Sequence, residues 1–516
     1  MKLKHYLASG LLITAMTTGA REARKPNIVI IMSDQQRADY CGREGFPLDI
    51  TPYVDSIARQ GAWFSNAYTS MPASSPARCS MFTGRYPNAT HVRTNHNIAD
   101  ITYGTDLMDV LHANGYSTAL VGKNHAYLKK SDFDFWTLYG HWGKESKPEY
   151  PGDPERKKFL SDSVGQSLTP SPIPVDNQQP SRIIDEALGF VDRQSADKPY
   201  FMWISFPEPH NPFQVCEPYF SMFNPDNIPA NHTSRADLAK KTDKYRILAK
   251  LEDQSCPNLL ADLPRLRANY MGMIRLIDDQ IKRFIESIKQ RGEWDNTIFI
   301  ILSDHGDFCG EYGLIRKGAG LSESLTRIPM VWAGGGIKKQ DGAMTDFVSI
   351  TDIYPTLCTA IGDTIPLGVQ GRSLWPMLTG ENYPKEEFSS IMVQLGYGGN
   401  DVPLTDDFTF SQEGAIGNGI ARFDELNTWT QSGMSRMVRQ GDWKLIVDSR
   451  GNGELYNLKS DPYELNNLYD SKKHIAQKCD MLNLMMKWEL RLQDPLPVPR
   501  HRYKFSRNPY NYYSAE

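Results

Sequence analysis

Five short apolar runs constrain the fold of this chain more than any other feature of its sequence. They cover residues 27–32, 117–121, 200–206, 297–302 and 328–333. Runs of this length, rich in β-branched and aromatic residues, are typical of strands that are buried on both faces. Such strands need helices on both sides of their sheet, so the runs favour an α/β fold.

Helical patterns alternate with these runs. The first begins at Thr51-Pro52, where Thr can cap the helix and Pro fits the first turn. Further helices are predicted over residues 105–115, 182–193 and 266–291. The alternation predicts a large, mostly parallel sheet sandwiched by helices.

The pattern changes after about Tyr383. Short antiparallel strands with Gly-rich turns, and then a helix, are predicted over residues 435–440, 443–447, 453–458 and 473–492. We therefore expect a large domain of residues 21–383 and a smaller C-terminal α+β subdomain of residues 384–516. Three long regions lack clear periodicity and are interpreted as binding loops: 140–180, 214–264 and 384–429.

The N-terminus has the layout of a secretory signal peptide. Lys2 and Lys4 precede an apolar stretch over residues 6–15, and Thr18-Gly19-Ala20 offers small residues for cleavage. We expect residues 1–20 to be removed and the protein to be exported. No later stretch reaches the roughly 18 apolar residues of a membrane helix, so no membrane insertion is expected after cleavage.

Composition excludes some classes of protein. The chain has 57 Lys and Arg against 61 Asp and Glu, a formal net charge of -4. A dedicated nucleic-acid binder would normally be basic, so no nucleic-acid partner is expected. The seven cysteines include no C-x-x-C pair, which excludes a zinc ribbon.

Polar clusters rich in Asp, His and Lys follow four of the predicted strands. They are Ser33-Asp34-Gln35-Gln36, Gly122-Lys123-Asn124-His125, Pro207-Glu208-Pro209-His210 and Ser303-Asp304-His305-Gly306. Ligands of open α/β sheets bind beyond the carboxyl ends of the strands. Four such clusters therefore predict a shared site at that edge.

One further segment, residues 74–84, reads Ser74-Ser75-Pro76-Ala77-Arg78 and continues to Thr83-Gly84. It resembles the signature of the type I sulfatases, a C/S-x-P-x-R box followed by Thr-Gly. The strand-end clusters, with Gly313 and Lys317, also resemble the motifs of that family and occur in its order. The chain is identified as a Ser-type bacterial member of this family, which belongs to the alkaline-phosphatase-like superfamily.

The resemblance implies a catalytic residue set. In this family the first residue of the box is oxidised to Cα-formylglycine (3-oxoalanine), which assigns the modification to Ser74. Its hydrate would be the nucleophile that attacks sulfur. The other implied roles are support of that residue by Arg78, sulfate binding by Lys123 and Lys317, base catalysis by His125 and acid catalysis by His210.

The modification has a physical reason. A sulfate monoester repels nucleophiles, and a plain Ser hydroxyl is a weak one. An aldehyde hydrate carries two hydroxyls on one carbon. One can attack sulfur, and the other can then lose its proton and expel sulfate.

The implied metal ligands are Asp34, Gln35, Ser74, Asp304 and His305. Oxygen-rich ligation favours Ca²⁺ over Mn²⁺ or Mg²⁺. Gln35 stands where a second Asp is usual in the family, and His305 where Asn is common. The nitrogen of His moves the preference slightly toward Mn²⁺ or Zn²⁺.

A Ser at the modified position resembles sulfatases of anaerobic or facultative bacteria, which a formylglycine-generating radical enzyme matures before export. With the signal peptide, this predicts a periplasmic enzyme. The expected substrate is a sulfated saccharide, with a glycosaminoglycan sugar favoured; its sulfate position, exo or endo action and the oligomeric state stay open. Four aromatic residues suit a saccharide, although a core role fits them equally: Trp136, Trp142, Tyr397 and Trp429.

Two alternatives stay open. The first is a phosphatase or phosphonate monoester hydrolase of the same superfamily, toward which Gln35 and His305 lean. The second is an exported glycan-binding protein that keeps the fold but leaves Ser74 unmodified.

Overall fold

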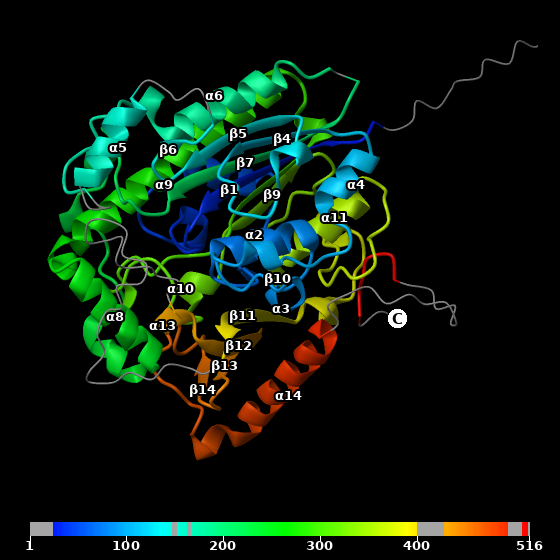
Figure 1. Ribbon diagram of the computed structural model, residues 1–516. Coiled ribbons are helices and arrows are strands. Elements are labelled where there is room, and N and C mark those ends of the chain that lie inside the picture. The colour runs from blue at the N-terminus through cyan, green and yellow to red at the C-terminus, as the bar shows by residue number, and fades with distance from the viewer. Residues whose placement is uncertain are drawn as a thin grey trace, which may run out of the picture.

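The structure is a computed structural model that describes residues 24–146, 152–162, 167–195, 197–399, 428–493 and 508–513. The predicted signal peptide therefore lies outside the described residues. An eight-stranded sheet crosses the molecule in the order β2-β9-β8-β1-β7-β4-β5-β6 (Figure 1). Its strands are β1 (Asn27–Asp34), β2 (Ala62–Trp63), β4 (Ser117–Gly122), β5 (Phe135–Gly140), β6 (Gly143–Lys144), β7 (Tyr200–Pro209), β8 (Thr297–Ser303) and β9 (Met330–Gly334).

The sheet is mostly parallel, as predicted. β1 pairs in parallel with β7 and β8, and β4 pairs in parallel with β7 and β5. β9 is antiparallel to β8, because the chain returns from β8 without a long crossover helix. A separate two-stranded sheet joins β3 (Ala67–Tyr68) to β10 (Val348–Ser349).

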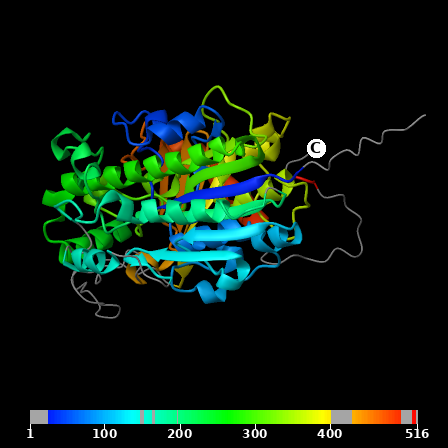
Figure 2. The same cartoon turned by 90° about the horizontal axis from the view of Figure 1, so that it is seen from above.

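Side chains alternate along β1 and serve two separate cores. Ile28, Ile30 and Met32 belong to one core, whereas Val29 and Ile31 belong to the other. The first core includes residues of α2 (Ser74–Thr83), α4 (Leu107–Ala113) and α11 (Ile353–Ala360). Three helices cover the opposite face: α1 (Pro52–Ala58), α6 (Gln179–Val191) and α9 (Leu259–Gln290). Figure 2 shows α9 running along the sheet beside β1. This is the predicted sandwich.

A smaller antiparallel sheet lies below the large one in Figure 1. It has the order β11-β12-β13-β14, with β11 (Ser390–Gly398), β12 (Gly433–Gln440), β13 (Trp443–Asp448) and β14 (Gly453–Asn457). Its outer face packs on α14 (Ile475–Leu492) through Val438, Leu445 and Trp488. Its inner face packs through Met437 on Tyr68 of the large unit. We propose that the domain boundary lies at 383/384, just before β11.

Several regions interpreted as loops contain regular structure. α8 (Asp243–Ser255) and β11 were not predicted, and α9 begins at Leu259 instead of 266. Pro264 lies near the start of α9, where Leu260 is exposed and a lost backbone bond costs little. Residues 400–427 of the third region lie outside the described residues.

The remaining helices are short or peripheral. They are α3 (Pro87–Thr90), α5 (Asp153–Asp162), α7 (Tyr219–Met222), α10 (Glu323–Thr326), α12 (Trp375–Thr379) and α13 (Thr428–Gln431). Among the helices described, none is both long and apolar enough to cross a membrane. All seven cysteines are described, and all are free thiols.

Gly122 ends β4 at the edge of the site and allows a close approach of two strands. Its φ is +121°, and a Cβ there would lie 1.9 Å from the carbonyl oxygen of Ser205. Gly115 also has a positive φ, +77°, but a Cβ there would meet no atom within 4 Å. We expect Gly122→Ala to lower the free energy of unfolding by about 1–3 kcal/mol more than Gly115→Ala, because only it adds a steric clash to backbone strain. Urea denaturation of both variants measures this difference, and equal losses would contradict it.

Candidate active site

Ser74 lies where the ends of the central strands meet the start of α2. The residue is fully buried, and its Oγ is 3.3 Å from Oδ1 of Asp34 and 3.0 Å from Nε2 of His305. Ala73 before it is extended, so Ser74 is the first helical residue. A helix N-terminus presents unpaired N–H groups that favour anions. The Ser74 side chain thus lies between two potential metal ligands, Asp34 and His305, and the N-terminus of a helix that can bind an anion.

Arg78 follows Ser74 by one helical turn and connects the surrounding strands. Its Nε donates to Asp304 at 2.9 Å, and its Nη2 lies 3.4 Å from Asp34. Its Nη1 donates to the backbone carbonyl of Lys123 at 3.0 Å and to Oγ of Ser205 at 2.8 Å. The fixed fork of a guanidinium suits this divided task, which a lysine could not perform.

Asp34, Asp304 and His305 form a group that could hold a metal ion. Each offers one ligand atom, and these atoms lie within 4.8 Å of one another. All three side chains are fully buried. Within the described part of the chain, this is the one group of three or more His, Cys, Asp or Glu side chains with such geometry.

The protonation states fit a cation site. Burial alone would raise the pKa of Asp34, but Lys123, His210, Arg78 and Lys317 together hold it well below its usual value. Asp304 is likewise held below its usual pKa, although burial and Asp34 oppose this. Both carboxylates are therefore charged and able to bind a hard cation.

His305 presents a neutral nitrogen to the same group. Burial lowers its pKa to about 4. Its Nδ1 lies 2.9 Å from the carbonyl oxygen of Gly306 and must donate the proton there. Nε2 therefore keeps its lone pair, and it points toward Ser74, 3.7 Å from Asp34 Oδ1 and 3.6 Å from Asp304 Oδ1.

Gln35 and Lys317 contact each other beside this group. Lys317 Nζ donates to Oε1 of Gln35 at 2.6 Å, and the Gln35 amide nitrogen donates to Asp307 at 2.5 Å. The backbone N–H of Gln35 donates to Oδ1 of Asp304 at 3.0 Å, with Gln35 in the left-handed region at φ 70°. The side-chain carbonyl of Gln35 thus shares its lone pairs with Lys317, so a metal would have to share this oxygen with the ammonium.

The less buried members of the site lie on one side. Lys123 contacts Asp34 through its ammonium group, and its Nζ lies 2.9 Å from Nε2 of His141. The ring of His141 stacks on His210 at 4.0 Å between centroids. His125 has its pKa held well below the usual value, first by burial and then by Lys123 and Arg78. Among the described residues its Nδ1 has no hydrogen-bond partner.

All ten residues expected at the site therefore lie in or beside one cluster at the carboxyl edge of the sheet. Sequence reasoning missed Asp307 and His141. Asp307 is fully buried, accepts from Gln35, and has its pKa raised to about 6 by burial. Its place directly after Gly306 was a signal that could have revealed it. His141 lies in the turn between β5 and β6, where no sequence pattern marks it.

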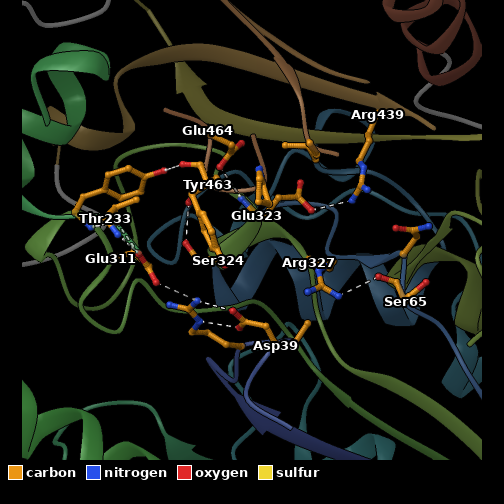
Figure 3. Close-up of a pocket in the computed structure, with 17 residues that line it drawn as sticks. Asp39, Ser65, Thr233, Glu311, Glu323, Ser324, Arg327, Arg439, Tyr463 and Glu464 are labelled. Atoms are coloured by element: carbon orange, nitrogen blue, oxygen red, sulfur yellow. Dashed lines mark hydrogen bonds and ion pairs between the residues drawn. The ribbon is translucent and has the colours of Figure 1, made fainter. Parts of the chain in front are cut away.

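A cavity of about 370 Å³ lies elsewhere, between the large unit and the small sheet (Figure 3). Its charged side chains pair with one another: Arg37 with Asp39 at 2.6 Å, and Arg439 with Glu323 at 2.9 Å. None of the expected site residues lines it. The cavity is therefore distinct from the cluster around Ser74.

This architecture and cluster define a class of hydrolases that act on anionic esters. The carboxylates and the imidazole can bind a cation, and the basic side chains can bind the anion. The sequence profile of the family described as Sulfatase matches residues 26–362. An arylsulfatase of Clostridium perfringens is 28% identical over 90% of this chain and 94% of its own. The chain therefore belongs to the sulfatase family, and it is a sulfuric ester hydrolase by class.

Two solved structures share its fold. A phosphonate monoester hydrolase of Agrobacterium radiobacter has a TM-score of 0.72 and 23% identity, over 91% of this chain and 96% of its own. The protein BT4656, in complex with its substrate D-glucosamine-2-N,6-O-disulfate, has a TM-score of 0.69 and 20% identity, over 91% and 99%.

The carboxylate cluster predicts stabilisation by a divalent cation. Chelator-treated protein should gain thermal stability when a divalent cation is added, by about 2.7 kcal/mol at a concentration 100 times the dissociation constant. Asp304→Asn should remove most of this gain, because it removes a charged ligand. Asp278→Asn, at a buried carboxyl on α9 outside the cluster, should keep it. A cation-induced Tm shift that survives in Asp304→Asn would show that the cation binds elsewhere.

Proposed function

We propose that this enzyme removes sulfate from a sulfated saccharide, with formylglycine derived from Ser74 as its nucleophile. The observation that carries the proposal is the position of Ser74 at the first turn of α2, in contact with Asp34 and His305. Around it lie the side chains of Arg78, Lys123 and Lys317, all buried. Their charges suit an anionic group held beside the nucleophile.

Maturation would convert the CH₂OH of Ser74 to CHO, with two electrons and two protons passing to a formylglycine-generating enzyme. Water then adds to the aldehyde and gives the hydrate. One hydroxyl gives up its proton to solvent and attacks sulfur while the bond from sulfur to the sugar oxygen breaks. The departing oxygen takes a proton from His210, which we assign as the general acid.

His125 is assigned as the base of the second step. It accepts the proton of the remaining hydroxyl, so that the carbon–oxygen bond to sulfate breaks and the aldehyde is restored. Its lowered pKa keeps the imidazole neutral, and its Nδ1 has no hydrogen-bond partner among the described residues. Both features support a role as proton acceptor. Lys123 and Lys317 are assigned to the sulfate oxygens.

The assigned metal ligands are Asp34, Gln35, Asp304 and His305, with the modified Ser74. The donor set fits a cation, because two charged carboxylates and a neutral imidazole converge. We propose Ca²⁺, with Mn²⁺ or Mg²⁺ as less favoured ions. A bound cation would supply charge stabilisation at the sulfate and at the nucleophile oxygen.

A glycosaminoglycan sugar is the proposed substrate. The substrate named for BT4656 is a sulfated glucosamine, and Trp142 is half exposed beside His141. Tyr397 is also exposed, whereas Trp136 packs against the core. The side chain of Trp429 lies outside the described residues. An exposed aromatic face suits the apolar side of a sugar ring.

Phosphonate or phosphate monoester hydrolysis is the second candidate. Gln35, His305 and the fold shared with the phosphonate monoester hydrolase favour it. Turnover of matched aryl sulfate and aryl phosphonate distinguishes the two. A strong preference for the phosphonate would reject our assignment.

Export completes the proposal. We propose that residues 1–20 direct the protein to the periplasm after the maturation enzyme has modified Ser74 in the cytoplasm. The enzyme would then act on sulfated saccharides that enter that compartment.

Mass analysis of the peptide that contains Ser74 tests the mechanism directly. In protein from the native host we expect the peptide to lack two hydrogens, because CH₂OH becomes CHO. Ser74→Ala should abolish turnover. Unmodified Ser74 in protein with full sulfatase activity would refute the nucleophile, and unmodified Ser74 with binding but no turnover would favour a glycan-binding protein.

Leaving-group dependence separates His210 from the lysines. A sugar alkoxide must be protonated as it departs, whereas a nitrophenolate need not be. His210→Ala should therefore slow a sulfated saccharide by about 100-fold or more, and an activated aryl sulfate much less. Lys317→Ala should slow both comparably, since it removes stabilisation of the sulfate itself. Comparable losses on both substrates for His210→Ala would mean that another group is the acid.

A further inference from the structure

His141 contacts two of the assigned catalytic groups at once. It lies in the turn between β5 and β6, and its Nε2 is 2.9 Å from Nζ of Lys123. Its ring stacks on that of His210 with centroids 4.0 Å apart and planes inclined by 24°. The sulfate-binding lysine and the general acid, which follow the different strands β4 and β7, thus both contact one imidazole.

The contact with Lys123 fixes the tautomer of His141. An ammonium group can only donate, so Nε2 must accept and the ring proton must reside on Nδ1. Burial, followed by the charges of His210 and Lys123, holds the pKa of His141 well below its usual value, so the ring stays a neutral acceptor. Lys123 also donates to Asp34. Two of its three protons are therefore directed by protein groups, which determines where the third points.

The contact with His210 fixes a ring plane. Nδ1 of His210 lies 2.6 Å from the carbonyl oxygen of Asn211, so this nitrogen carries a proton there and Nε2 is the atom that can protonate a leaving group. Because the His141 ring is stacked on one face of the His210 imidazole, it hinders rotation of that imidazole about its Cβ–Cγ bond.

We propose that His141 is a positioning residue that holds the Lys123 ammonium and the His210 ring at a fixed spacing, so that sulfate binding and leaving-group protonation act on the same ester. The inference rests on the proposed function. A histidine meets both needs, since Phe could stack but not accept, whereas Gln could accept but not stack.

Two variants separate the contacts. His141→Phe keeps the stacked ring and loses the acceptor, so kcat/KM should fall about 10-fold for a sulfated saccharide and an activated aryl sulfate alike. His141→Gln keeps an acceptor and loses the ring, so the saccharide should be slowed at least about 10-fold more than the aryl sulfate. In His141→Gln/His210→Ala the saccharide should be no slower than in His210→Ala, because the ring acts through that acid.

His232 is the matched control. Its ring stacks on that of Tyr463 with centroids 3.9 Å apart, and it lies outside the cluster around Ser74. His232→Phe and His232→Gln should leave both activities unchanged. The positioning role is overturned if the ratio of saccharide to aryl sulfate activity is the same in His141→Phe as in His141→Gln. It is also overturned if the fold-losses of His141→Gln and His210→Ala multiply in the double variant.

A readout without turnover keeps this inference separate from the proposed function. Protons over the face of an aromatic ring are shielded, so in labelled metal-free protein the His210 ring signals should move downfield in His141→Gln and much less in His141→Phe. Absence of that difference would overturn the inference even in an active enzyme. Wild-type protein with this signature but no sulfatase turnover would reject the proposed function alone.

Discussion

The guanidinium of Arg78 compensates two buried carboxylates and touches the ends of four strands. It contacts Asp34 at the end of β1, Asp304 after β8, the Lys123 carbonyl after β4 and Ser205 on β7. Two carboxylates this close would repel each other in a medium of low dielectric. Removal of one partner from a buried charge group costs about 3–5 kcal/mol, so the cluster depends on this residue. Arg78 also fixes the first turn of α2, and with it Ser74.

The charges around Ser74 are arranged in two layers. Asp34, Asp304 and His305 lie deepest and can hold a cation, whereas Lys123 and His210 lie toward the less buried side with His141. This order suits an ester whose anionic end points inward.

The small sheet is joined to the large unit by both apolar and ionic contacts. Met437 and Ile446 pack against Tyr68, while Glu323 pairs with Arg439 and with Lys444 at 2.9 Å each. The Glu323–Arg439 pair lines one wall of the charged cavity (Figure 3). The apolar face makes the C-terminal sheet part of the same packed body, and the ion pairs fix its orientation.

The sequence by itself determined the parallel strands, the helices on both faces and the residues at the strand ends. Periodicity and short motifs carry those features, because they reflect local burial and local chemistry. It did not reveal β11, α8 or the antiparallel direction of β9, which depend on long-range pairing. Only the tertiary structure decided that Lys317 contacts Gln35 and that His141 joins Lys123 to His210. Such contacts arise between segments far apart in the chain, so no local pattern encodes them.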